Sequence, residues 1–226
     1  MVMKKGFWII LCMFFIPPVT FAGNMKLHYD RPAEYFEEAL VIGNGTMGAT
    51  LYGGVKKDKI SFNDITLWTG EPESENSSPD AFNTIPEIRA LLDNEDYQGA
   101  DKAQYKVQGH YSENYQPLGT LTIEYLDDTA GISDYHRWLD IGNATARTQY
   151  LKDGELFTSD YFASAPDSVI VIRLKSENKE GIHALLSFDS PLPHSSQVAD
   201  NEISVEGYAA YHSFPVYYKA EDKHRY

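Results

Sequence analysis

Cysteine is nearly absent from this chain of 226 residues, whose one cysteine, Cys12, lies close to the amino end. Disulfide-stapled folds, thiolate metal sites and cysteine nucleophiles are therefore excluded for the rest of the chain. Basic residues are also scarce, with 19 Lys and Arg against 33 Asp and Glu and a formal charge of −14. Because such an acidic surface repels phosphate backbones and anionic headgroups, we expect no nucleic-acid partner, whereas a neutral sugar is compatible with it.

Long hydrophobic runs are missing except at the amino end. There Lys4-Lys5 precedes an apolar stretch over 7–16 and then Thr20-Phe-Ala22, an order typical of a secretory signal peptide cleaved after Ala22. A membrane anchor is the less favoured alternative, because the stretch is shorter than the ~20 residues needed to span a bilayer and Pro17-Pro18 follows it. The sequence thus predicts residues 1–22 as a signal peptide and an exported protein, periplasmic or extracellular, with no membrane association after cleavage. Loss of Lys4 and Lys5 moves the formal charge from −14 to −16.

Metal and nucleophile motifs are missing as well. The seven histidines are never four residues apart, so no helical zinc pair is present. No G-x-S-x-G elbow occurs either, which removes the usual sign of a serine hydrolase of the α/β type. We expect no metal and no other cofactor.

One glycine-rich segment, Gly43-Asn-Gly45-Thr-Met-Gly48, matches the G-x-G-x-x-G spelling of dinucleotide-binding loops. Such a loop needs a helix directly after its last glycine, whose N-terminal amides hold the pyrophosphate. Only four residues separate Gly48 from Gly53-Gly54, which is too short for a helix. Asp64 stands near the place of a ribose-binding acid but is one of many acids here. We predict a strand, a turn and a second strand.

Most other segments have the spelling of strands. Residues 118–125 alternate apolar and polar side chains, which is the period of a half-buried strand. Asp153-Gly154 separates strand-like runs over 144–151 and 155–162 and predicts a tight hairpin. Val169-Ile-Val-Ile172 is apolar throughout, so we expect both of its faces to be covered, as in the middle of packed sheets. The fold class predicted is mainly β, an antiparallel β-sandwich.

A short helical insertion interrupts these strands. Thr84-Ile-Pro-Glu87 has the form of a capping box, which predicts a helix beginning there. Asn94 is expected to cap a second short helix that runs to Tyr105. Residues 71–79 before the pair are polar and rich in proline, so we interpret them as an exposed loop.

Two blocks, residues 38–55 (EALVIGNGTMGATLYGGV) and 59–70 (KISFNDITLWTG), resemble the start of the family 95 glycoside hydrolases, which are mostly α-L-fucosidases with some α-L-galactosidases. Val41-Ile42 stands where that family usually has Pro-Leu, and Met47 where it has Leu. Later stretches continue the likeness in the same order over nearly the whole mature chain: residues 85–92, 115–119, 135–140 and 161–170. The resemblance implies a sandwich of the super-sandwich type over 23–226, incomplete at its carboxyl end and followed in the family by further strands, a linker and a helical barrel.

The resemblance also implies where catalysis occurs. Inverting glycosidases need one carboxylic acid to protonate the leaving oxygen and a second carboxylate to activate water, the two lying roughly 6.5–9.5 Å apart. In family 95 these acids belong to the helical barrel. We therefore assign no catalytic residue to this chain.

Polar and aromatic residues at the end of one strand could still contact a sugar: Asn63, Asp64, Thr66 and Trp68. Indole rings stack on pyranose faces, and amides or carboxylates bind hydroxyls. The alternative, which we favour, is that Trp68 fills the core while Asn63 or Asp64 satisfies turn backbone. A second candidate is the loop that contains His110 and Gln116, for which the alternative is an ordinary surface connection.

The sequence as a whole predicts the non-catalytic N-terminal module of an exported, inverting α-L-fucosidase-like exo-glycosidase. Its partner would be an oligosaccharide or glycoconjugate, bound through the barrel. The alternative is a stand-alone carbohydrate-binding β-sandwich without hydrolytic activity, which would present an exposed aromatic platform.

Overall fold

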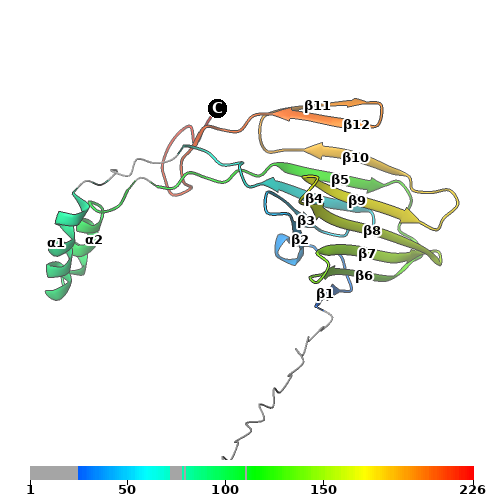
Figure 1. Cartoon of the computed structure of the whole chain (residues 1–226), viewed down its shortest axis with the longest axis horizontal. Coiled ribbons are helices and arrows are strands. Elements are labelled where there is room, and N and C mark those ends of the chain that lie inside the picture. The colour runs from blue at the N-terminus through cyan, green and yellow to red at the C-terminus, as the bar shows by residue number, and fades with distance from the viewer. Residues whose placement is uncertain (1–24, 72–77, 79, 110) are drawn as a thin grey trace, which may run out of the picture.

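Two five-stranded antiparallel sheets form the body of the protein in the computed structural model, and a pair of helices lies apart from them (Figure 1). The structure describes residues 25–71, 78, 80–109 and 111–226. The predicted signal peptide, His110 and most of the predicted loop over 71–79 lie outside these residues. Among the residues described, no helix is both long and apolar enough to cross a membrane.

The first sheet has the strand order β1-β6-β7-β8-β9. Its strands are β1 (Lys26–Tyr29), β6 (Ile132–Asp140), β7 (Thr145–Lys152), β8 (Glu155–Ser164) and β9 (Val169–Ser176). The predicted hairpin is confirmed between β7 and β8, where Asp153 and Gly154 have φ angles of 52° and 87°. Two consecutive positive φ values are what a tight turn between twisted strands requires.

The second sheet has the order β10-β5-β4-β3-β2. Its strands are β2 (Leu40–Gly43), β3 (Met47–Leu51), β4 (Lys57–Asp64), β5 (Gly119–Tyr125) and β10 (Ala184–Asp189). The strand–turn–strand prediction for the glycine-rich segment is confirmed, since β2 and β3 pair as a hairpin with Gly43 opposite Gly48. The Asn44 side chain accepts hydrogen bonds from the backbone N–H groups of Thr46 and Met47, at 3.0 and 2.8 Å.

The core lies between the two sheets, where β2 packs across β6, β7 and β8 and β3 across β9. Ile60 of the second sheet is 0% exposed, and Tyr161 of the first sheet is also buried. Tyr150 and Phe157 stack with ring centroids 5.3 Å apart. The predicted β-sandwich class is therefore confirmed, and burial of these side chains supplies the main favourable term in its folding.

An aspartate and an arginine are buried among the described residues of this body. Asp58 accepts hydrogen bonds from the Tyr161 hydroxyl at 2.7 Å and from the Gly54 N–H at 2.9 Å, and burial raises its pKa above the ordinary value. Arg137 donates to the backbone oxygens of Arg31 and Glu38, both at 2.8 Å. Arg137 thereby fixes the segment that leads from β1 to the 3-10 helix η1 (Phe36–Glu38).

The apolar segment Val169–Ile172 is not in the middle of a sheet, so that prediction is wrong. It lies in β9, the edge strand of the first sheet, and Val169 is exposed while Ile170 and Ile172 pack against the core. A run that is apolar at every position indicates two apolar faces, but it says nothing about whether both edges are paired.

The helical insertion consists of α1 (Ala81–Asp93) and α2 (Tyr97–Gln104), and both predicted caps are wrong. Helix α1 begins at Ala81, so Thr84 lies inside it, and the Thr84 hydroxyl donates to the Asp80 carbonyl at 3.1 Å. The N-cap of α2 is Asp96, whose carboxylate accepts from the Gly99 N–H at 2.9 Å. Asn94 instead follows the end of α1 as its C-cap.

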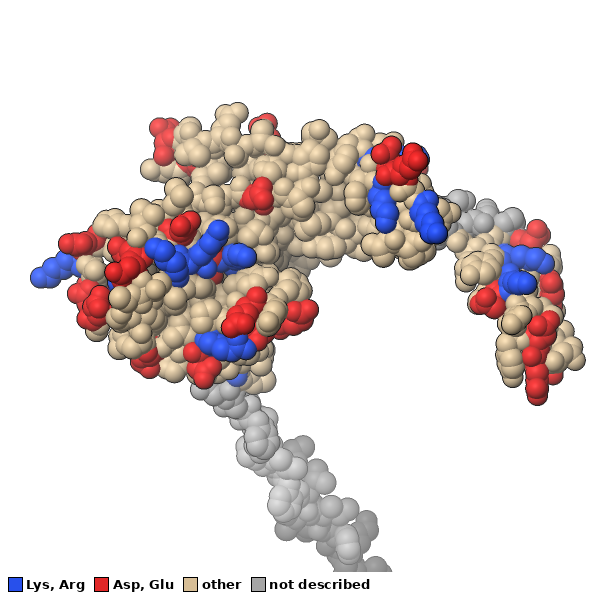
Figure 2. All heavy atoms as spheres, turned by 180° about the vertical axis from the view of Figure 1, so that it is seen from behind, with Lys and Arg blue, Asp and Glu red and all other residues tan. Residues whose placement is uncertain are grey.

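Two further hairpins complete the chain: β11 (His194–Ala199) with β12 (Glu202–Gly207), and β13 (His212–Ser213) with β14 (His224–Arg225). The first lies near β10, and the second ends close to the point where the chain leaves toward the helices (Figure 1). In Figure 2 charged side chains of both signs are scattered over the sandwich and the helices, and a further group of both signs lies on the surface between them.

Candidate functional site

The predicted sugar-binding edge follows the end of β4. Asp64 is the last residue of that strand, and one of its carboxylate oxygens accepts from the Thr66 N–H at 2.8 Å and from the Thr66 hydroxyl at 2.6 Å. These hydrogen bonds lower the pKa of Asp64, the Thr66 hydroxyl having the largest effect. The interpretation of Asp64 as a residue that satisfies turn backbone is confirmed.

Trp68 lies on the surface, so the favoured interpretation that it fills the core is wrong. It is 54% exposed, and its ring lies beside that of Tyr115, which is 49% exposed, with centroids 6.5 Å apart. The backbones of the two residues meet in an isolated antiparallel bridge, and the Gln116 N–H donates to the Leu67 carbonyl at 3.0 Å. The chain has left the sheet at this point, and the indole remains uncovered.

A part-buried carboxylate lies close in the sequence to Tyr115 of this aromatic pair and joins the segments around it. Glu113 accepts from the Thr69 hydroxyl at 2.6 Å, from the Ser213 N–H at 3.1 Å and from His212 Nδ1 at 2.7 Å. Desolvation raises the pKa of Glu113, but hydrogen bonds from Thr69, the Ser213 N–H and His212 outweigh it, so the pKa lies below its ordinary value. Three segments far apart in the sequence are thereby joined at one side chain.

Gln116 takes part in the same junction and is not presented to solvent. Its amide nitrogen donates to the Ala210 carbonyl and its amide oxygen accepts from the Ala210 N–H, both at 3.0 Å. The side chain is buried, so it forms a two-bond clamp to the backbone of the carboxyl-terminal segment. The alternative of an ordinary surface connection is wrong for this residue, and His110 lies outside the described residues.

Asn63 precedes the last residue of β4, lies on the outer face of the second sheet and lines the same cleft as Tyr115. Its side-chain oxygen is buried without a hydrogen-bond partner. Asn63 therefore does not satisfy turn backbone in the way that Asp64 does. A role in sugar binding stays a prediction for Asn63, Asp64, Thr66, Trp68 and Gln116.

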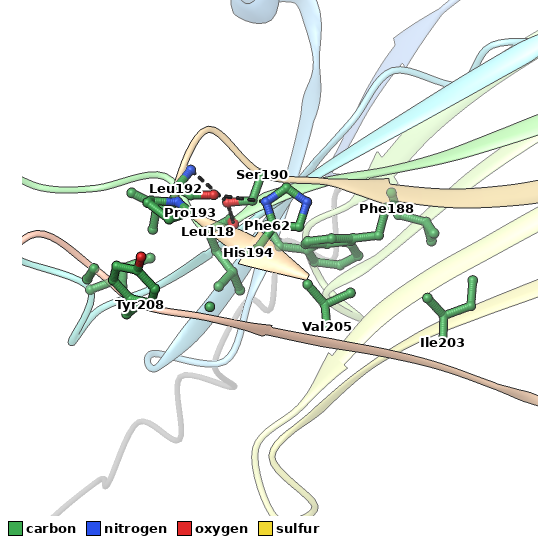
Figure 3. Close-up of a pocket in the computed structure, with 14 residues that line it drawn as sticks. Phe62, Leu118, Phe188, Ser190, Leu192, Pro193, His194, Ile203, Val205 and Tyr208 are labelled. Atoms are coloured by element: carbon green, nitrogen blue, oxygen red, sulfur yellow. Dashed lines mark hydrogen bonds between the residues drawn. The ribbon is translucent and has the colours of Figure 1, made fainter. Parts of the chain in front are cut away.

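An apolar cavity of about 490 Å³ lies elsewhere, between the core-facing side of β4, β5 and β10 and the hairpin β11–β12 (Figure 3). Leu121 and Phe188 line it from the second sheet, and Ile203 and Val205 line it from β12. Ser190 supplies polar groups to the lining. Its hydroxyl donates to the Leu118 carbonyl at 2.7 Å and accepts from the Leu192 N–H at 3.1 Å. The cavity offers apolar packing surface and no acid pair.

Carboxyl groups with low exposure in the described residues are occupied by protein partners. Asp58 is bonded to Tyr161, Glu113 to His212, and Asp160 to two arginines, Arg147 and Arg173. No group of three or more His, Cys, Asp or Glu residues that could hold a metal ion occurs in the described part of the chain. The arrangement is that of a sandwich module with an exposed aromatic edge.

Comparison with known proteins identifies the class and then the family. The class is the N-terminal β-sandwich of a glycoside hydrolase, and the chain belongs to the family described as "Glycosyl hydrolase family 65, N-terminal domain", whose model matches residues 27–224. It is 32% identical over 187 residues to alpha-L-fucosidase 2 of Arabidopsis thaliana, covering 81% of this chain and 22% of that protein. It is 28% identical over 179 residues to a probable alpha-fucosidase A of Aspergillus niger, covering 74% of this chain and 22% of that protein.

These matches confirm the predicted resemblance to the N-terminal domain of a fucosidase-like glycoside hydrolase. The chain spans about a fifth of the length of these relatives, 22% in both cases. Sequence reasoning missed Glu113 and His212. Glu113 lies in the candidate loop between His110 and Gln116, but its partners come from segments about 45 and 100 residues away.

Proposed function

We propose that this chain is the non-catalytic N-terminal module of an exported exo-acting enzyme that hydrolyses terminal α-L-fucosyl linkages with inversion. The observation that carries the proposal is the relationship to alpha-L-fucosidase 2 over 81% of the chain. In this proposal the acid that protonates the leaving oxygen and the carboxylate that activates water belong to a part of the enzyme beyond this chain.

The module's role would be to pack against the rest of the enzyme and support it. Three surfaces suit that role because this chain leaves them uncovered: the apolar cavity lined by Leu121, Phe188 and Val205, the aromatic edge of Trp68 and Tyr115, and the outer sides of α1 and α2. Apolar surface of this kind gains free energy when another part of a protein covers it, at roughly 25 cal/mol per Å².

An assay of the purified 226-residue chain with an aryl α-L-fucoside tests the proposal. We expect no turnover above a blank prepared in the same way, provided that a cooperative thermal transition first shows the chain to be folded. Turnover that co-purifies with the folded chain would overturn the non-catalytic role. The aromatic edge favours a second candidate, a stand-alone carbohydrate-binding sandwich, and an open reading frame without a following helical region would support it.

A further inference from the structure

A cleft of about 430 Å³ lies on the outer face of the second sheet, the face that points away from the core. Successive side chains of a strand point to opposite faces. Because Ala49 of β3 and Ile60 of β4 are buried in the core, their neighbours Thr50 and Ser61 point outward. The pairing of β3 with β4 places Thr50 opposite Ser61 and Gly48 opposite Asn63.

The floor of this cleft is polar, and part of its hydrogen-bonding capacity is unused. The Ser61 and Thr120 hydroxyls bond to each other at 3.0 Å. The Thr50 hydroxyl and the Asn63 side-chain oxygen have no partner, although both atoms are buried. Buried polar atoms without partners cost free energy, and their presence in native proteins points to a water or ligand that completes them.

The walls of the cleft are aromatic. Phe36 of η1 is 63% exposed, and Tyr115 forms part of the lining together with Val41 and Pro117. Trp68 lies beside Tyr115 and extends the aromatic surface beyond the cleft. A polar floor between exposed rings suits a ligand that has hydroxyl groups on its edges and C–H groups on its faces.

Charge excludes other ligand classes. None of the residues that line the cleft is Lys, Arg, Asp, Glu or His, so a phosphate, a carboxylate or a cation would find no countercharge there. The volume lies in the range of small-molecule sites, roughly 300–1,000 Å³.

We propose that this cleft binds a neutral saccharide. The Asn63 side-chain amide and the Ser61 and Thr120 hydroxyls bind its hydroxyls, and Tyr115 and Phe36 contact its ring faces. The inference goes beyond the proposed function, because a packing module needs no saccharide site of its own. It also stands apart from the hydrolysis assay, since the folded chain can bind a sugar whether or not it turns one over.

Titration calorimetry of the 226-residue chain with 2′-fucosyllactose, and separately with lactose, tests the site. We expect saturable binding of at least one of these neutral sugars. Asn63→Leu removes the amide, whose oxygen has no partner, so it should leave the melting temperature unchanged or higher while weakening binding about fivefold, as expected for one hydrogen bond. Tyr115→Ala should weaken binding by about tenfold.

Tyr97→Ala on α2 is the matched control, because this tyrosine is also exposed but lies outside the cleft lining. It should leave the affinity unchanged. We expect a Kd of about 1 mM or tighter, so about 10 mM sugar should saturate the site. The proposal is overturned if the folded chain shows no saturation with either sugar at that concentration. It is equally overturned if binding survives both Asn63→Leu and Tyr115→Ala unchanged.

Discussion

The sandwich and the pair of helices differ in how much of their apolar surface this chain covers. In the sandwich Ile60 is 0% exposed, whereas Phe82 on α1 is 83% exposed. Inside the helical pair the buried residues are small: Thr84, Ala100 and Ala103. Helices of 13 and 8 residues are too short to be stable in water by propensity alone. The sandwich therefore has its own core, while the helices depend on covering surface from elsewhere.

The largest expected effect comes from truncating matched isoleucines in the two regions. Ile60→Ala should lower the free energy of unfolding by about 2–5 kcal/mol, because it leaves a cavity in the core. Ile85→Ala on α1 removes the same atoms from a partly exposed site and should cost less than about 1 kcal/mol. Urea unfolding of both variants measures the difference, and equal losses would contradict the comparison.

Glu113 gives a smaller effect with its own control. Glu113→Gln weakens the junction to Thr69, His212 and Ser213 and should cost about 1–2 kcal/mol at neutral pH. Glu87→Gln removes an exposed ion pair with Lys106 on the helices and should cost less than about 0.5 kcal/mol. Chemical denaturation at pH 7 compares the two, and a larger loss for Glu87→Gln would reverse the expectation.

The stabilisation from Glu113 should also depend on pH. Its pKa in the folded protein lies below the ordinary value of 4.5, so its stabilisation is complete above that value and is lost as the pH falls through the folded pKa. The stability difference between wild type and Glu113→Gln should therefore be largest above pH 5 and shrink in acid. A difference that stays constant down to the acid transition would show that the carboxylate form is not responsible.

Asp58 should show the opposite dependence on pH. Burial raises its pKa, so its contribution is favourable below the ordinary value of 3.8 and falls as the pH rises through the folded pKa. Asp58→Asn removes the titration and keeps a polar partner for Tyr161, so it should remove the loss of melting temperature that wild type shows as the pH rises above 3.8. Asp93→Asn on α1 is the exposed control. A melting temperature of Asp58→Asn that tracks wild type across this range would contradict the raised pKa.

The smallest effect is expected at Phe82. Because this ring is almost fully exposed in the chain, Phe82→Ser should change the free energy of unfolding by less than about 0.5 kcal/mol. A loss of more than 1 kcal/mol in urea unfolding would mean that the ring is covered within this chain.

Local chemistry made the hairpins predictable. Asp153 and Gly154 adopt the positive φ angles that their sequence favours, and Asn44 closes the glycine-rich turn with its own side chain. The predicted N-cap of α1, Thr84, lies four residues after the observed N-cap, Asp80. The Thr84 hydroxyl donates to the Asp80 carbonyl one turn earlier in the helix. The sequence does not distinguish such a threonine from one that caps a helix.

The candidate site was only partly predictable, because its geometry depends on distant segments. The loop with Gln116 was found from its composition, but the clamp to Ala210 joins residues that are 94 positions apart. Trp68 was expected in the core since tryptophan is usually buried. Its exposure follows from where β4 ends and from its pairing with Tyr115, which is itself exposed. No local pattern reports either fact.

The central claim is that the sandwich folds on its own core while the helices are left to be stabilised by other contacts. Native-state hydrogen exchange of the 226-residue chain tests it directly. Amides in β4, β5 and β8 should open only with global unfolding and exchange at least about 100-fold more slowly than those in α1 and α2. Equal protection of the helices and these strands would contradict the account.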